Sequence, residues 1–144
     1  MRRREFVTFL GGGTVAWSLA AYAQQPERVR RIGSLTAFAE TDMEVQTWYA
    51  TFRKRLDELG WVEGHNIHID YRWGAGSVAQ KQVFAKELVQ LNPEVILSGT
   101  TPATAALQAE THTIPIVFAG VSDPLGSGFV ASLAHPGGNI TGFH

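Results

Sequence analysis

The sequence of 144 residues contains no cysteine. This absence excludes disulfide bonds, thiolate metal sites, a thiol nucleophile and a lipid-modified cysteine at a processed N-terminus. Long apolar runs are also missing, because the longest one, within residues 6–21, falls short of the ~20 apolar residues that a membrane-spanning helix needs. A surplus of positive charge is absent too, with 12 basic against 13 acidic residues. The chain therefore has no electrostatic footprint for nucleic acid, and we expect no stable insertion into a membrane.

Residues 1–23 have the composition of an export signal. Three arginines at positions 2–4 precede the apolar run, and Ala21-Tyr22-Ala23 supplies the small-x-small pattern at which signal peptidase cuts. Residues 3–7 also fit a twin-arginine signal, so the general secretory route and the twin-arginine route both stay open. We expect the mature chain to begin near Gln24 and to reside in the periplasm as a soluble protein.

Short apolar runs alternate with helical patterns along the rest of the chain, as in a parallel sheet covered by helices. Two apolar runs, Val95-Ile96-Leu97 and Ile116-Val117-Phe118, are unbroken, which is typical of strands covered on both faces. Residues 67–73 alternate instead and indicate an edge strand. Right-handed crossovers then predict a doubly wound α/β fold whose five parallel strands lie in the order 2-1-3-4-5. The expected strands are residues 31–35, 67–73, 95–97, 116–118 and 139–143, and the expected helices are residues 45–59, 78–91, a short one from 101 onward, and 125–133.

Residue types mark the ends of two helices. Gly60 fits the C-terminal cap of the first helix. Thr101 is expected to cap the free amide groups of the short helix, with Pro102 in its first position, where proline loses no hydrogen bond. The apolar stripe of the first helix is expected at Val45, Trp48, Phe52, Leu56 and Leu59.

Ligands bind to sheets of this kind beyond the carboxyl ends of the strands, because helix N-termini with free amide groups converge there. In the loop after residues 95–97, hydroxyl groups stand beside a helix start, and Gly99 allows a ligand to approach the backbone closely. This loop suits a carboxylate, and Asp123 suits a ligand ammonium group. Helix capping alone is the competing explanation for these residues. The predicted ligand-binding residues are Ser34, Thr36, Ser98, Gly99, Thr100, Thr101, Ser122 and Asp123.

No catalytic or cofactor-binding set is found. Residues 74–79 match the G-x-G-x-x-A fingerprint, but they follow an edge strand, and no acidic residue ends the next strand. His65 and His68 are three residues apart, which places side chains of a strand on opposite faces, so no metal site is predicted. No serine lies in a G-x-S-x-G elbow. We therefore predict neither an enzyme nor a cofactor. Trp48 and Tyr49 are expected in the core, with stacking on a ligand ring as the alternative.

Five segments carry a resemblance to a known family. They are Ile32-Gly33, Phe52 through Gly60-Trp61 with Glu63-Gly64, Ala85 to Leu88, Asn92-Pro93 and, most specifically, the block from Ser122 to Gly142. On these residues, the chain from Arg30 to His144 resembles the bacterial ABC transporter substrate-binding proteins whose characterised members bind aromatic or other hydrophobic amino acids. His135 departs from the pattern, since members usually carry arginine there.

The resemblance implies the first lobe of a type I periplasmic-binding-protein fold. Members of the family clamp a ligand between two lobes and deliver it to an ABC permease and its ATPase. Residues 24–144 are expected to form the N-terminal lobe of such an extracytoplasmic receptor for a small amino acid-like ligand, with the second lobe absent, as in a truncated form. Because half of the clamp is missing, we predict weak or undetectable ligand binding by this chain alone.

Two other functions stay open on the sequence. An exported enzyme subunit that carries a nucleotide or flavin would suit a twin-arginine signal, because that route handles prefolded cofactor proteins. A periplasmic sensor domain would share the fold and address a kinase instead of a permease. Flavin or nicotinamide absorbance of the purified protein separates the first from a receptor, and neighbouring permease and ATPase genes would argue against the second.

Overall fold

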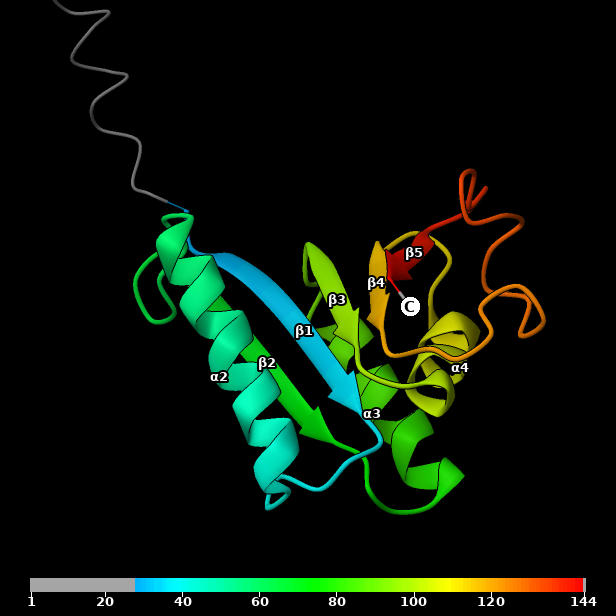
Figure 1. Cartoon of the computed structure of the whole chain (residues 1–144), viewed down its shortest axis with the longest axis horizontal. Helices are drawn as coiled ribbons and strands as arrows, with labels where there is room; N and C mark the ends of the chain where they lie inside the picture. The colour runs from blue at the N-terminus through cyan, green and yellow to red at the C-terminus, as the bar shows by residue number, and fades with distance from the viewer. Residues whose placement is uncertain (1–27, 144) are drawn as a thin grey trace, which may run out of the picture.

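The computed structural model describes residues 28–143, so the predicted export signal at residues 1–23 lies outside the described residues. The described residues form one five-stranded parallel sheet in the order β2-β1-β3-β4-β5 (Figure 1), which confirms the predicted fold class and strand order. The strands are β1 (Arg30–Thr36), β2 (Ile67–Trp73), β3 (Val95–Ser98), β4 (Ile116–Ala119) and β5 (Ile140–Phe143), and the helices are α2 (Met43–Glu58), α3 (Val78–Gln90) and α4 (Thr101–Glu110).

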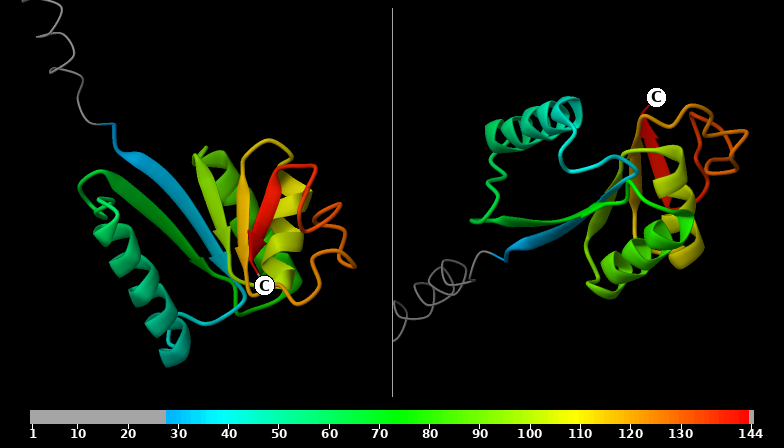
Figure 2. Two further views of the ribbon diagram at one scale, coloured as in Figure 1. Left: turned by 45° about the horizontal axis from the view of Figure 1, so that its top comes forward. Right: turned by 90° about the horizontal axis from the view of Figure 1, so that it is seen from below.

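The helices cover the two faces of the sheet unequally. α3 and α4 lie together on one face, and α2 lies alone on the other, on the side of β1 and β2 (Figure 2). No helix among residues 28–143 lies over β4 and β5 on the α2 face. Half of that face is therefore left open. The main core fills the other face, and its fully buried members include Leu35, Leu88, Ile96, Leu107, Ile116 and Phe118.

Local residue types explain where the elements begin and end. The side chains of Asp42 and Ser77 accept hydrogen bonds from backbone N–H groups in the first turns of α2 and α3. Gly60 follows α2 with φ +90, the left-handed conformation expected of a C-terminal cap. In β2, Ile67 is buried and His68 is exposed, and the strand lies at the edge of the sheet as predicted.

Residues 125–133 do not form the predicted helix, and the connection from β4 to β5 is a series of turns instead. The Asp123 carboxylate does accept a hydrogen bond from the Gly126 N–H at 2.8 Å, as a helix cap would. Gly128 then adopts φ +72, and this left-handed residue stops the chain from continuing as a helix. Phe129 is nonetheless buried against the main core, so the turns cover the sheet in place of a helix.

Two finer predictions are also wrong. Thr100, and not Thr101, caps α4, and Thr101 is its first helical residue. The buried residues of α2 are Val45 and Tyr49, whereas Trp48 is 51% exposed. The buried stripe of α2 differs from the predicted one because α2 covers only one half of its sheet face. A side chain of α2 that turns toward the open half stays accessible to solvent.

Candidate functional site

The carboxyl ends of β1, β3 and β4 meet at one rim of the sheet. The Gly99 N–H donates to the Leu35 carbonyl at 2.9 Å, which joins the ends of β1 and β3. Thr36 is buried, and a Cβ atom added to Gly99 would lie only 3.0 Å from its Oγ1. Gly120, at φ +79, lies against the Gly99 carbonyl oxygen. Glycine therefore suits position 99 because any larger side chain there would crowd Thr36.

The first turn of α4 begins at the same rim. Thr100 Oγ1 accepts a hydrogen bond from the Ala103 N–H at 3.4 Å, and Pro102 has no N–H to offer. The Thr101 N–H is thus the donor that this turn can spare for a ligand. A helix N-terminus also carries a partial positive charge, which favours an anionic group such as a carboxylate.

Ser98 points into the protein and not toward the rim. Its hydroxyl is buried and lies 2.7 Å from Thr104 Oγ1, and the Thr104 hydroxyl donates to the Thr100 carbonyl at 2.9 Å. These hydroxyls tie the end of β3 to the first turn of α4. Ser98 therefore shapes the helix start, and direct contact between its hydroxyl and a ligand stays a prediction.

Ser34 is buried beneath an aromatic cluster on the α2 face. Its Oγ lies 2.8 Å from the Tyr49 hydroxyl, so the two hydroxyl groups satisfy each other. The Tyr49 ring packs edge-on against Tyr71 at 5.6 Å and Trp73 at 5.0 Å between ring centroids. Burial raises the pKa of the Tyr49 phenol, and the hydrogen bond to Ser34 opposes part of that rise. The phenol is therefore neutral at physiological pH and fixes α2 to β1.

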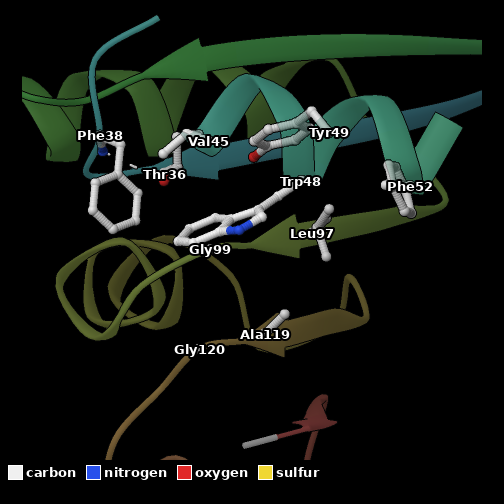
Figure 3. A pocket seen from close by; sticks show the side chains of 10 residues that line it. All are labelled: Thr36, Phe38, Val45, Trp48, Tyr49, Phe52, Leu97, Gly99, Ala119 and Gly120. Carbon is white, nitrogen blue, oxygen red and sulfur yellow. Dashed lines mark hydrogen bonds between the residues drawn. The ribbon is translucent and has the colours of Figure 1, made fainter. Parts of the chain in front are cut away.

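A pocket of about 380 Å³ lies between α2 and the open half of the sheet. Figure 3 shows the Trp48 ring extending from α2 into the pocket, with Phe38 on one side of it and Leu97 of the sheet on the other. The rings of Trp48 and Phe38 meet edge-on at 5.8 Å. The pocket has an almost wholly apolar wall, and it is lined by Thr36, Phe38, Val45, Trp48, Tyr49, Phe52, Leu97, Gly99, Ala119 and Gly120.

The structure brings together some of the predicted site residues and separates others. Thr36 and Gly99 line the pocket directly. Ser122 and Asp123 are exposed in the turn after β4 and do not line it, and Gly126 occupies one carboxylate oxygen of Asp123. The polar rim and the apolar pocket therefore lie side by side, and the predicted site residues Thr36 and Gly99 belong to both.

Sequence reasoning missed most of the pocket wall. Phe38 lies in a loop that carries no motif, and Leu97 and Ala119 belong to strands that were predicted to be covered on both faces. The stripe of α2 did contain Val45 and Phe52, but periodicity cannot show that the facing half of the sheet lacks a helix. Trp48 is the exception, because the sequence analysis gave stacking on a ligand ring as an alternative role for it.

Among residues 28–143, no group of three histidine, aspartate or glutamate side chains is placed to hold a metal ion. In the same described part of the chain, no helix has both the length and the apolar character to cross a membrane.

Replacing Gly99 tests how tightly the rim is packed. We expect Gly99→Ala to lower the free energy of unfolding by about 1 kcal/mol, because the new Cβ would lie 3.0 Å from the buried Thr36 hydroxyl. Gly138→Ala is the matched control, since no atom lies within 4 Å of a Cβ there. Urea unfolding measures both. Equal midpoints for the two variants would contradict the close packing of Thr36 and Gly99.

The fold and the pocket define a class of protein. The sheet is open and parallel with a pocket at the carboxyl ends of its strands, and solved structures with a periplasmic-binding-protein fold match this chain. Residues 34–144 match the model of the family described as ABC transporter substrate binding protein. The chain therefore belongs to the ABC transporter substrate-binding protein family.

Individual relatives agree with this assignment. A curated relative, the tyrosine-binding protein of Clostridioides difficile (strain R20291), is 35% identical over 91 residues, which are 63% of this chain and 26% of the relative. A conserved domain protein from Vibrio cholerae is 32% identical with a TM-score of 0.74, over 80% of this chain and 38% of its own.

A second solved structure contains a ligand. It is the ABC domain from Streptococcus pneumonia in complex with L-Trp, which is 28% identical with a TM-score of 0.71, over 78% of this chain and 37% of its own. The chain thus spans between about a quarter and two fifths of the length of these relatives. The matching family is described as substrate binding and the curated relative is named for tyrosine binding, and neither name describes an enzyme.

Proposed function

We propose that residues 24–144 form the N-terminal, ligand-contacting lobe of an extracytoplasmic receptor for an aromatic or other hydrophobic amino acid. The receptor delivers this ligand to a membrane permease that is driven by an ATPase. The carrying observation is the aromatic pocket of about 380 Å³ that opens beside the polar rim of the sheet. A free amino acid with a large apolar side chain needs both surfaces, one for each end of the molecule.

The pocket accommodates the side chain of the ligand. Its volume is at the lower end of the range for small-molecule sites, which suits a single ring system. Trp48 is 51% exposed, so its ring has accessible area for stacking or edge-on contact with an aromatic ligand. Among residues 28–143, no charged side chain lines this pocket, so a charged ligand side chain would lose its hydration without compensation.

The rim holds the backbone groups of the ligand. The Thr101 N–H and the start of α4 face the carboxylate, while the exposed Asp123 carboxylate accepts from the ammonium group. Thr36 and Gly99 separate these polar contacts from the apolar wall, because they line the pocket at the strand ends. Three other predicted residues support the rim through their own hydrogen bonds and do not contact the ligand: Ser34, Ser98 and Thr100. Ser122 borders the site of the ammonium group.

Export and transport complete the proposal. Residues 1–23 serve as a signal peptide that directs the chain to the periplasm, where a solute receptor meets its ligand. Membership of the ABC transporter substrate-binding protein family supports a permease and its ATPase as the partners. The relatives extend well beyond this chain, and a receptor of their length supplies the second lobe that closes over the ligand.

Trp48→Ala tests the pocket. In NMR titrations of the exported chain, L-tryptophan and L-tyrosine are expected to shift the Trp48 indole and the Thr36 and Gly99 amides, whereas glycine shifts none of them. We expect binding weaker than micromolar, since one lobe alone cannot bury the ligand. Trp48→Ala removes an aromatic contact worth about 1 kcal/mol, so we expect it to raise the dissociation constant roughly fivefold.

Trp61→Ala is the matched control for this titration, because Trp61 is also partly exposed but does not line the pocket. It should bind L-tryptophan as the unmodified chain does. Equal affinities of Trp48→Ala and the unmodified chain would contradict the assignment of the pocket. Micromolar affinity in calorimetry would contradict the need for a second lobe.

A further inference from the structure

The pocket beside the polar rim has two ends of different chemistry. Gly99 directly follows β3, so the pocket wall beside it belongs to the rim. α2 begins at this rim and runs back along the sheet (Figure 1), and Phe52 lies in its third turn, roughly 13 Å along the helix from its start. Leu97 precedes Gly99 by two residues, about 7 Å back along β3. Phe52 and Leu97 therefore form the inner end of the pocket, and Figure 3 shows Phe52 opposite the end that holds Thr36 and Phe38.

The polar side chains of the pocket wall lie away from this inner end. They are Thr36, Trp48 and Tyr49. Thr36 lies at the rim, where its Oγ1 accepts a hydrogen bond from the Phe38 N–H at 3.4 Å, and the Tyr49 hydroxyl is occupied by Ser34. The Trp48 ring lies midway along the pocket, and its indole N–H can donate a hydrogen bond but cannot accept one. None of these three side chains therefore offers an acceptor at the inner end.

The backbone at the inner end is occupied as well. Leu97 belongs to β3, which pairs with β1 on one side and with β4 on the other. Phe52 lies inside α2, where the backbone groups bond to one another. Within the described part of the chain, the inner end thus supplies neither a donor nor an acceptor to a ligand. A hydroxyl group at the tip of a ligand side chain would lose its hydrogen bonds to water there without replacement.

We propose, on the basis of the receptor function inferred above, that the pocket selects amino acids whose side chain is hydrocarbon to its tip, such as phenylalanine, over those with a polar tip, such as tyrosine. The backbone groups of the ligand stay at the rim, and its ring extends inward past Trp48. The tip of the ring then meets Phe52 and Leu97, which pack well against carbon but leave a phenol hydroxyl unpaired. The preference is moderate, because an apolar pocket rejects an added hydroxyl group by at most about 100-fold.

Three related ligands test the chemistry of the inner end. L-phenylalanine, 4-methyl-L-phenylalanine and L-tyrosine are titrated separately into the exported chain, and the NMR shifts of the Thr36 and Gly99 amides report binding. The methyl group takes the place of the phenol hydroxyl at similar size, so comparison of the last two ligands separates polarity from volume. We expect the dissociation constant of L-tyrosine to be roughly fivefold higher than that of 4-methyl-L-phenylalanine.

Two substitutions supply the missing partner. Leu97→Thr places a hydroxyl group on the strand side of the inner end, and Phe52→Tyr places one on the helix side, so the test does not depend on a single variant that folds. Each should lower the ratio of the two dissociation constants at least roughly twofold, because the phenol gains a hydrogen bond. Val83→Thr is the matched control, since Val83 is 54% exposed on α3, across the sheet from the pocket, and its ratio should stay unchanged.

The outcomes separate this selectivity from the receptor function itself. Equal affinities for L-tyrosine and 4-methyl-L-phenylalanine would overturn the selectivity and leave the receptor function standing. If both ligands bound more weakly than L-phenylalanine by the same factor, the inner end would exclude volume and not polarity, which would overturn it too. Folded Leu97→Thr and Phe52→Tyr with unchanged ratios would contradict the placement of the ligand tip. Absence of any shift with all three ligands and with L-tryptophan would instead contradict the receptor function.

Discussion

Leu107→Ala is expected to lower the free energy of unfolding by about 3 kcal/mol and the melting temperature by roughly 10 °C. Leu107 is fully buried on the inner side of α4, where it belongs to the main core with Ile116 and Phe118. Truncation removes apolar contacts and leaves a cavity that the neighbouring strands cannot fill. Urea and thermal unfolding followed by circular dichroism measure the loss.

Leu133→Ala is the matched control for the core substitution. Leu133 is 53% exposed in the turns between β4 and β5, so its truncation should change stability by no more than about 0.5 kcal/mol. If both leucine variants lost the same stability, the placement of the core between the sheet and α4 would be wrong.

Gly142→Ala should remove β5 from the sheet and cost about 3 kcal/mol. A Cβ atom at this position would overlap the Phe118 carbonyl oxygen and lie 2.6 Å from the Phe118 Cγ atom. Phe118 is only 1% exposed at the centre of the core, so it has no room to move away. The clash is therefore relieved most easily by separation of β5 from β4.

Two measurements check this prediction. The urea m-value should fall, because less surface is exposed on unfolding once β5 is already detached. Exchange of the amides of β5 should accelerate relative to those of β1. Gly138→Ala again serves as control, since its Cβ would meet no atom within 4 Å. A Gly142→Ala variant with an unchanged m-value and protected β5 amides would contradict the close packing of β5 on Phe118.

Much of the fold is predictable because its determinants are local. Val95-Ile96-Leu97 and the alternating residues of β2 distinguish central from edge strands, and right-handed crossovers leave few possible strand orders. The failure at residues 125–133 is instructive. This segment has an N-terminal cap at Asp123 and apolar residues at suitable intervals, yet the positive φ of Gly128 and burial of Phe129 on the sheet favour turns. Tertiary burial outweighed local helix propensity there.

The candidate site, like the fold, was predictable from the sequence only in part. Thr36 and Gly99 were found from their position after strands, since the ends of parallel strands meet at one rim. The aromatic wall was not found as a set, because Phe38, Trp48 and Leu97 come from three elements and share no motif. Whether they face a covering helix or an open cavity depends on the half of the sheet that α2 leaves free.

The sequence alone determined the order of elements, the two edges of the sheet, the family resemblance and the loops that form the rim, since spacing and residue type encode these features locally. The tertiary structure decided which polar groups remain available at that rim. Ser34 is used by Tyr49 and Ser98 by Thr104, in each case by a residue from a neighbouring helix. A hydroxyl group gives no sign in the sequence of where its partner lies, because packing of helix on sheet brings the two together.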